Sequence, residues 1–190
     1  FPRRQLALAT ATLANGGTRY QPHLGKAMVD AVSRETTALP QVPGVDLGYR
    51  PAHVDVVRKA MVGVTQSGTS TRVFAGARYL SGGKTGTAQA VTIGQKDRYN
   101  AARMEERQRD HSLYIAFAPA DAPRIAVAAI VENAGFGAAH AAPIVRRVFD
   151  YWLLGQYPND EDMAAVRKGM AGAPIGKPRL ASDVPWPPAP

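Results

Sequence analysis

Residues 79–89, Tyr-Leu-Ser-Gly-Gly-Lys-Thr-Gly-Thr-Ala-Gln, bring a cation, hydroxyls and glycines together in one short run. Since side chains alternate along a strand, Thr85 and Thr87 fall on one face and Lys84 on the other. Gly86 has no Cβ, so another backbone or a ligand can approach the strand closely between the two threonines. The pattern predicts a strand edge that binds an extended peptide through main-chain groups while the hydroxyls orient a carboxylate.

The same stretch could support acyl transfer. A backbone N–H at a strand edge can face a developing oxyanion, and such a donor usually stabilises the transition state by a few kcal/mol. Lys84 would add a positive charge for a carboxylate or tune the pKa of a nearby nucleophile. The alternative is a glycine-rich turn with a solvated lysine, because a bare Lys-Thr-Gly tripeptide often occurs by chance.

Residues 84–89 resemble the third signature of the penicillin-recognising serine acyl-transferases, and their Thr-Ala-Gln ending is similar to that of the class B penicillin-binding proteins. Four further segments that resemble this family follow in the same order along the chain: Arg-Asp-His at 109–111, Ala-Phe-Ala-Pro at 116–119, Val-Glu-Asn at 131–133 and Ala-Pro-Ile at 142–144. Residues 1 to about 155 are similar to the elongation-specific transpeptidases of the penicillin-binding protein 2 type.

The resemblance implies the C-terminal half of a transpeptidase domain, with an α+β fold in which helices cover an antiparallel sheet meander. The two other signatures of the family are Ser-x-x-Lys and a Ser-x-Asn or Ser-Asp-Asn element. The only literal Ser-x-x-Lys runs from Ser81 to Lys84 and has two glycines where a helical turn is needed, and no Ser-x-Asn occurs. We therefore expect the nucleophilic serine on polypeptide that precedes Phe1, and no turnover by this chain alone.

Position by position, the resemblance implies catalytic roles for Lys84 and Thr87, and substrate binding by Lys84, Thr85, Gly86, Thr87 and Ala88. The charge of Lys84 and the hydroxyls of Thr85 and Thr87 would bind the terminal carboxylate of a stem peptide. The Thr87 backbone N–H would complete an oxyanion hole with the N–H of the serine. No cofactor is expected.

The implied activity is the cross-linking of peptidoglycan during cell elongation. The upstream serine would attack the D-Ala-D-Ala bond of a stem peptide, form an acyl-enzyme and pass the acyl group to an amine on a neighbouring strand. Stem peptides, the lipid-linked precursor and inhibitory β-lactams are then its ligands. The implied partners are the missing N-terminal half of the domain, a SEDS-type glycan polymerase and a rod-complex scaffold. The implied location is the periplasm, with an inner-membrane anchor upstream.

Two other readings keep part of this picture. A D,D-carboxypeptidase or a β-lactamase would have the same fold, but water would resolve the acyl-enzyme; the Thr-Ala-Gln ending and the 109–117 block favour the transpeptidase. A non-catalytic basic module would instead present its sheet edge to an anionic polymer. That module predicts binding that falls steeply with salt and does not respond to a β-lactam.

Composition favours one globular domain or part of one. The 190 residues are 45% hydrophobic and 20% charged, and the net charge of +8 suits an anionic partner. The cations are scattered and no aromatic ladder interleaves them, so we expect no nucleic-acid partner. No metal site is expected either, because His23, His53, His111 and His140 are isolated in the sequence. No window reaches 18 apolar residues, so no membrane span is predicted.

Periodicity predicts helices at 3–15, from Pro51 to a stop at 67–68, and from a turn at 135–137 to Gly155. Strands are predicted at 79–91, 111–117 and 125–131, the last one covered by helices on both faces. Short extended pieces at 18–33, a surface connection at 36–50 and a solvated excursion at 92–110 complete residues 1–155, the predicted half-domain. Residues 156–190 are rich in proline and glycine and are predicted to be a tail that either wraps the surface or lacks order.

Two local patterns carry expectations about packing. The last helix has an apolar stripe that we expect to pack on the sheet, with Arg146, Arg147 and Asp150 mostly outside; the stripe consists of Ile144, Val145, Val148, Phe149, Trp152 and Leu153. Residues 68–71, Gly-Thr-Ser-Thr, match the place where the family carries a Gly-Thr turn that leads towards the motif strand, but an ordinary helix stop followed by a hydroxyl-rich turn is favoured there over a catalytic role. His111 begins a predicted strand, where a structural role is favoured over acid–base catalysis.

Overall fold

A three-stranded antiparallel sheet forms the centre of the chain in the computed structural model, which describes residues 3–90, 104–170 and 172–184. Its strands are β5 (Gly82–Ala88), β6 (His111–Ala118) and β7 (Ile125–Val131), in the order β5-β6-β7. The register pairs Thr85 with Tyr114, and Tyr114 with Ala129. The predicted meander is confirmed, with the Lys-Thr-Gly strand at its edge.

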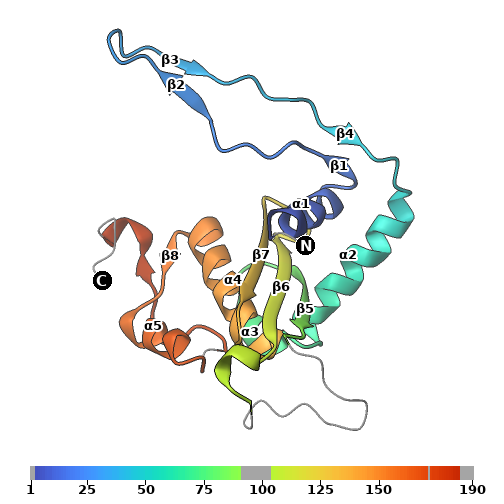
Figure 1. Ribbon diagram of the computed structural model, residues 1–190, viewed down its shortest axis with the longest axis vertical. Coiled ribbons are helices and arrows are strands. Elements are labelled where there is room, and N and C mark those ends of the chain that lie inside the picture. The colour runs from blue at the N-terminus through green and yellow to red at the C-terminus, as the bar shows by residue number, and fades with distance from the viewer. Residues whose placement is uncertain (1–2, 91–103, 171, 185–190) are drawn as a thin grey trace.

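Helices cover both faces of this sheet, as the apolar composition of β7 predicts (Figure 1). Helices α1 (Arg3–Ala14) and α2 (Pro51–Gln66) lie on one face, and α4 (Gly137–Leu154) with the short α3 (Thr71–Phe74) lies on the other. Alternate residues of β6 therefore enter different cores. Tyr114 packs with the α3 and α4 side chains, whereas Phe117 packs with Met61 of α2.

Residues 18–50 form an arm that projects from this body (Figure 1). It contains two antiparallel ladders, β1 (Thr18–Arg19) with β4 (Val45–Asp46), and β2 (Ala27–Val29) with β3 (Thr36–Ala38). The short extended pieces predicted at 18–33 are present. The segment predicted as a surface connection contains strands β3 and β4, which pair with the preceding strands β2 and β1 and not within the segment.

Helix α4 contradicts the prediction that its polar side chains lie mostly outside the packed interior. Arg146, Arg147 and Asp150 are only 5%, 8% and 7% exposed. The apolar stripe is buried at Val145 and Phe149, but Trp152 is 59% exposed. Ile144 and Val148, also predicted to lie on the sheet, are exposed and line a groove with side chains of the C-terminal helix.

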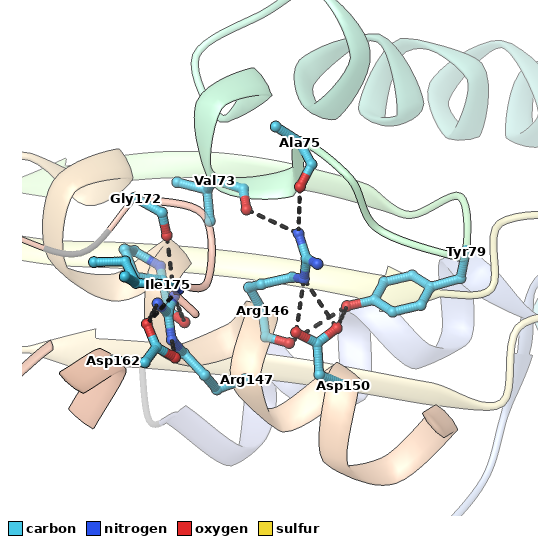
Figure 2. Close-up of polar contacts among 10 residues, drawn as sticks. Val73, Ala75, Tyr79, Arg146, Arg147, Asp150, Asp162, Gly172 and Ile175 are labelled. Atoms are coloured by element: carbon cyan, nitrogen blue, oxygen red, sulfur yellow. Dashed lines mark hydrogen bonds and ion pairs between the residues drawn. The ribbon is translucent and has the colours of Figure 1, made fainter. Parts of the chain in front are cut away.

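The buried charges of α4 are held by two separate networks (Figure 2). In the first, Arg146 Nε lies 2.9 Å from both carboxylate oxygens of Asp150, and its Nη1 donates to the carbonyls of Val73 and Ala75 at 3.1 Å. The Tyr79 hydroxyl donates to Asp150 Oδ1 at 2.7 Å. Burial, together with the Asp150 carboxylate, raises the pKa of Tyr79, so its hydroxyl remains a donor. This network joins α4 to the segment that leads into β5.

The second network attaches the C-terminal segment to α4 (Figure 2). The Arg147 guanidinium pairs with Asp162 through two hydrogen bonds and donates to the Gly172 carbonyl at 3.0 Å. Asp162 also accepts from the Ile175 backbone N–H at 3.1 Å. The sequence alone left open whether this segment wraps the surface, and here it lies on α4.

The described part of the C-terminal segment has secondary structure of its own. It consists of β8 (Gln156–Tyr157), α5 (Asp160–Arg167), β9 (Arg179–Leu180) and the 3-10 turn η3 (Ala181–Asp183), with β8 and β9 paired. The Asn159 side chain accepts from Asp162 N–H at 2.8 Å, which gives α5 an ordinary N-cap. Acidic residues fill the first turn of α5, where the helix dipole favours them.

Most of the predicted 92–110 excursion, and Val91 at the end of the predicted strand, lie outside the described residues. The part that is described holds the 3-10 turn η2 (Glu106–Gln108). Among the helices that the structure describes, none has the length and apolar character that a membrane span needs.

Candidate functional site

The predicted site residues lie together on β5, at an open edge of the sheet. In the described part of the chain β5 pairs with β6 alone, so its second edge has no strand partner. Lys84, Thr87 and Ala88 are exposed, and Thr85 and Gly86 are partly exposed. Neither threonine is turned into the hydrophobic interior.

Strand alternation places the cation and the alcohols of β5 on opposite faces. Lys84 lies across from Ile115, whose side chain joins the core beneath α1 and α2. Thr85 lies across from Tyr114, on the face of α3 and α4. The Lys84 Nζ donates to the Thr85 carbonyl at 2.6 Å, so the ammonium stays beside the strand.

Glycine is required at Gly83 because an aromatic side chain crosses directly beneath it. A Cβ added there would lie 2.1 Å from the Tyr114 hydroxyl oxygen. The start of α4 approaches β5 and β6 in the same manner: a Cβ added at Gly137 would lie 2.6 Å from the Gly86 carbonyl oxygen and 2.4 Å from that of Leu113. These close approaches fix the strand from the α4 side and leave its free edge open.

The turn between α2 and α3 also contacts the site strand. The Thr69 hydroxyl lies 3.1 Å from that of Thr85. Ser70, fully buried, is hydrogen-bonded to the Tyr114 hydroxyl at 2.8 Å. Burial raises the pKa of Tyr114 to about 12, although the hydrogen bond with Ser70 opposes the shift. The turn is thus more than a helix stop, because it touches β5 and is fixed to the strand next to it.

The serine of the literal Ser-x-x-Lys does not resemble a nucleophile. Ser81 is 2% exposed, and its carbonyl accepts from the Thr65 hydroxyl at 2.6 Å. Residues 82–84 are extended, so Ser81 and Lys84 are not one helical turn apart. This arrangement agrees with the prediction that the reacting serine lies elsewhere.

His111 lies across from Ala88, at the far end of the site strand. Its Nδ1 accepts from the Asn133 backbone N–H at 3.0 Å, which requires the ring proton on Nε2 when the imidazole is neutral. Asn133 has a left-handed φ of 55°, and its side-chain amide donates to the carbonyls of Arg107 and Arg109 at 2.9 and 3.0 Å. His111 therefore shares in a clamp that holds residues 107–111.

No metal centre is found among the residues that the structure describes, where no group of three or more His, Asp or Glu side chains comes together. A cavity of about 270 Å³ lies between α4 and the C-terminal segment. Arg146, Arg147, Asp150 and Asp162 line it, and they pair with one another. The charged groups that line this cavity are therefore engaged in ion pairs.

Sequence reasoning favoured a helix stop at Thr69 and gave no role to the Tyr114 side chain, although both contact this strand, and it gave no role to Asn133, which holds residues 107–111. Asn133 was part of a recognised segment, but its left-handed backbone and its two carbonyl partners have no sequence signature. The alternation at 111–117 predicts Tyr114 on β6, where the structure has it. Only the glycine at position 83 hints at its course, since a glycine within a strand often marks a close approach.

Comparison with known proteins places these features in a family. Residues 4–150 match the model of the penicillin binding protein transpeptidase domain. The chain is 43% identical over 157 residues to the peptidoglycan D,D-transpeptidase MrdA of Acinetobacter baumannii. The aligned region covers 82% of this chain and 23% of that protein. With MrdA of Escherichia coli K12 the identity is 33% over 171 residues, covering 89% of this chain and 26% of the relative.

Solved structures show the same relationship. Pseudomonas aeruginosa PBP2 in complex with WCK 5153 superposes with a TM-score of 0.58 and 37% identity, over 80% of this chain and 30% of that one. An imipenem acyl-enzyme complex of penicillin-binding protein A from Mycobacterium tuberculosis gives a TM-score of 0.59 and 31% identity, over 77% of this chain and 29% of that one. The chain spans about a quarter of the length of the curated relatives that it matches.

Proposed function

The chain belongs to the penicillin-binding protein transpeptidase family, and from this premise we propose that β5 forms one wall of the active site of a serine-type peptidoglycan D,D-transpeptidase. The chain would supply the C-terminal half of that domain. The observation that carries the proposal is the Lys84–Ala88 edge, which is open to a ligand and presents two hydroxyls on one face. The names of the relatives support the transpeptidase over the carboxypeptidase and the β-lactamase.

The substrate would bind as an additional extended strand at the free edge of β5. Main-chain groups of β5 would then pair with the stem peptide, which fixes its direction and depth. The Thr85 and Thr87 hydroxyls would donate to the terminal carboxylate, and the Lys84 ammonium would supply the opposite charge. Gly86 and Ala88 keep this surface low enough for a peptide backbone to approach.

The reaction would follow the acyl-enzyme route of the family. The serine Oγ, from polypeptide outside this chain, attacks the carbonyl carbon of the penultimate D-Ala, and the bond to the terminal D-Ala breaks. The terminal D-Ala leaves as an amine that has gained a proton. The Thr87 backbone N–H, with that of the serine, would stabilise the oxyanion. An amine of a neighbouring stem peptide then attacks the ester and releases the serine.

This function implies the ligands and the surroundings of the protein. Stem peptides and the lipid-linked precursor would be substrates, and β-lactams would acylate the same serine. The solved complex of the imipenem acyl-enzyme of a relative supports the last point. The protein would work in the periplasm, held to the inner membrane by a segment outside this chain, with a SEDS-type glycan polymerase and a rod-complex scaffold as partners.

Labelling with fluorescent penicillin tests the proposal in the full-length protein. Lys84→Ala should slow the formation of the covalent adduct by roughly 100-fold or more, because it removes the positive charge held beside the site strand. Lys59→Ala is the matched control, since Lys59 is an exposed lysine of α2 whose partner is Asp55. Circular dichroism should show that both variants are folded.

Two results would count against the proposal. One is a folded wild-type protein that penicillin does not label, and the other is a Lys84→Ala variant that is labelled as fast as the Lys59→Ala control. Binding to an anionic cell-wall polymer that falls steeply with salt and is indifferent to penicillin would instead support the non-catalytic basic module.

A further inference from the structure

The turn between α2 and α3 brings a third hydroxyl to the alcohol face of β5. Thr69 Oγ1 lies 3.1 Å from Thr85 Oγ1, and both groups are accessible to solvent. The two residues are 16 positions apart, and the contact exists because α2 packs along β5 and ends beside it. The edge of β5 thus presents a small array of hydroxyls, of which the Lys-Thr-Gly-Thr sequence supplies two.

The position of this turn is fixed from the buried side of the sheet. Ser70 Oγ bonds to the Tyr114 hydroxyl at 2.8 Å and donates to the Val64 carbonyl at 3.1 Å. Tyr114 is completely buried and lies directly across from Thr85 in the strand register. Since the Tyr114 hydroxyl fills the space beneath Gly83, the turn and the site strand rest on the same side chain.

The other hydroxyls of residues 67–71 are engaged elsewhere. Thr71 Oγ1 donates to the Gly68 carbonyl at 2.9 Å, and Ser67 Oγ lies 3.4 Å from the Gly63 carbonyl. Among the hydrogen bonds of the described residues, Thr69 is therefore the hydroxyl of this turn that reaches β5. Its contact with Thr85 lies at the surface where the substrate is expected.

A threonine hydroxyl has one proton to donate and can accept in addition. If Thr85 donates to a carboxylate, its oxygen is free to accept from Thr69, and the two bonds form a chain that strengthens both. If Thr69 is absent, the Thr85 hydroxyl can rotate and direct its proton away from the ligand. Thr69 can therefore strengthen carboxylate binding only when the Thr85 hydroxyl is present.

We propose that Thr69 is a positioning residue that orients the Thr85 hydroxyl toward the carboxylate of the stem peptide or β-lactam. This inference rests on the function proposed for β5. Thr69 does not react with the substrate. It acts through Thr85, and it makes the α2–α3 turn a determinant of selectivity for ligands that carry a carboxylate.

A double-mutant cycle in the full-length protein tests this role, with the rate of acylation by benzylpenicillin as the readout. Thr69→Val removes the hydroxyl and keeps the shape, and it should lower the acylation rate by roughly three- to tenfold. Thr69→Ser should restore most of the rate. In a Thr85→Val background, Thr69→Val should have no further effect, since its partner is already absent.

Two comparisons separate positioning from a merely structural role. Thr71→Val makes the same chemical change in the same turn and should leave the acylation rate near that of the wild type. The methyl ester of benzylpenicillin lacks the carboxylate charge, so Thr69→Val should slow its reaction less than that of the acid. Equal losses with acid and ester, or losses that add in the Thr85→Val background, would overturn the inference.

The outcomes for the inference and for the proposed function are distinct. A wild-type protein that is folded but never acylated contradicts the proposed function. A wild-type protein that is acylated normally, with Thr69→Val acylated just as fast, contradicts only the role of Thr69. If Thr69→Val lowered the melting temperature, Thr69→Ala would serve as a second truncation, to be compared with Thr69→Ser at a temperature where all are folded.

Discussion

Strand β5 and helix α4 both carry charged and polar side chains, but the structure treats them in opposite ways. On β5, Lys84 and Thr87 face solvent at the sheet edge. On α4, Arg146, Arg147 and Asp150 are buried. The direction of a side chain on a strand is set by alternation, which is local. Whether the polar face of a helix stays in water depends on what another segment of the chain places over it.

On α4 those covering segments come from both directions along the chain. Arg146 reaches one carbonyl within α3 and one directly after it, and Arg147 reaches Asp162 and the Gly172 carbonyl in the C-terminal segment. Buried charges are tolerated when they are paired and hydrogen-bonded, and both arginines meet this condition. The difference from β5 is that α4 serves to join parts of the fold, whereas β5 leaves its polar groups available.

The largest expected effect follows from breaking the α4 side of this contrast at Arg147. Arg147→Ala leaves Asp162, which is 1% exposed, as a buried charge without its cation. Such a change should lower the free energy of unfolding by about 3–5 kcal/mol, as measured by urea denaturation. It should also make the 156–184 segment more sensitive to limited proteolysis.

An ion pair of the same type at the surface provides the control. Arg179 pairs with Asp160 at 3.1 Å, but the two side chains are 40% and 95% exposed. Arg179→Ala should therefore cost only about 0–1 kcal/mol. Equal losses for Arg147→Ala and Arg179→Ala would show that burial of the α4 charges does not matter. The paired replacement Arg147→Met with Asp162→Leu should recover much of the loss, since no unpaired charge remains.

The second prediction concerns the point where the two regions meet. Gly137 begins α4 directly against the backbone of β5 and β6, so that an added Cβ would lie 2.4 Å from the Leu113 carbonyl oxygen. Backbone atoms cannot move aside as a side chain can, and Gly137→Ala should destabilise the protein by about 1–3 kcal/mol. It should also slow acylation by penicillin in the full-length protein, because β5 has to shift.

Gly63→Ala makes the same substitution where there is room for it. Gly63 lies inside α2, and an added Cβ there meets no atom within 4 Å. Alanine is the better helix former, so this variant should gain about 0.5–1 kcal/mol. If both glycine variants changed stability in the same direction, the close packing of α4 on the site strand would be refuted.

These contrasts explain which features could be predicted from the sequence. The strands, their meander and the open Lys-Thr-Gly edge follow from period-two alternation and turn residues, which act within a few positions. The family resemblance at 68–71 predicts a turn that leads towards the motif strand, but the contact of Thr69 with Thr85 depends on how α2 ends beside β5, which no local pattern gives. The burial of Arg146 and Arg147 depends on partners that an amphipathic pattern cannot name, so the same pattern misassigned the polar face of α4.

The smallest expected effect is a pH dependence from Tyr114, the buried side chain behind β5. Burial raises its pKa from 10.0 to about 12. The folded state therefore keeps its proton in a range where the unfolded chain has lost it. This stabilisation is complete below about pH 10 and is lost as the pH rises through about 12. At pH 11 the free energy of unfolding has fallen by about 1.4 kcal/mol on this account.

Tyr114→Phe should remove this part of the alkaline loss, although it costs roughly 1 kcal/mol at pH 7 through the missing hydrogen bond to Ser70. Urea unfolding at pH 8, 10 and 11 measures the change in slope. Tyr20→Phe, at a tyrosine of the arm that is 55% exposed, should leave the slope as in the wild type. An unchanged slope in Tyr114→Phe would mean that water reaches the core behind β5. The buried hydrogen bond between Tyr114 and Ser70 would then not hold the turn that carries Thr69 in one fixed position.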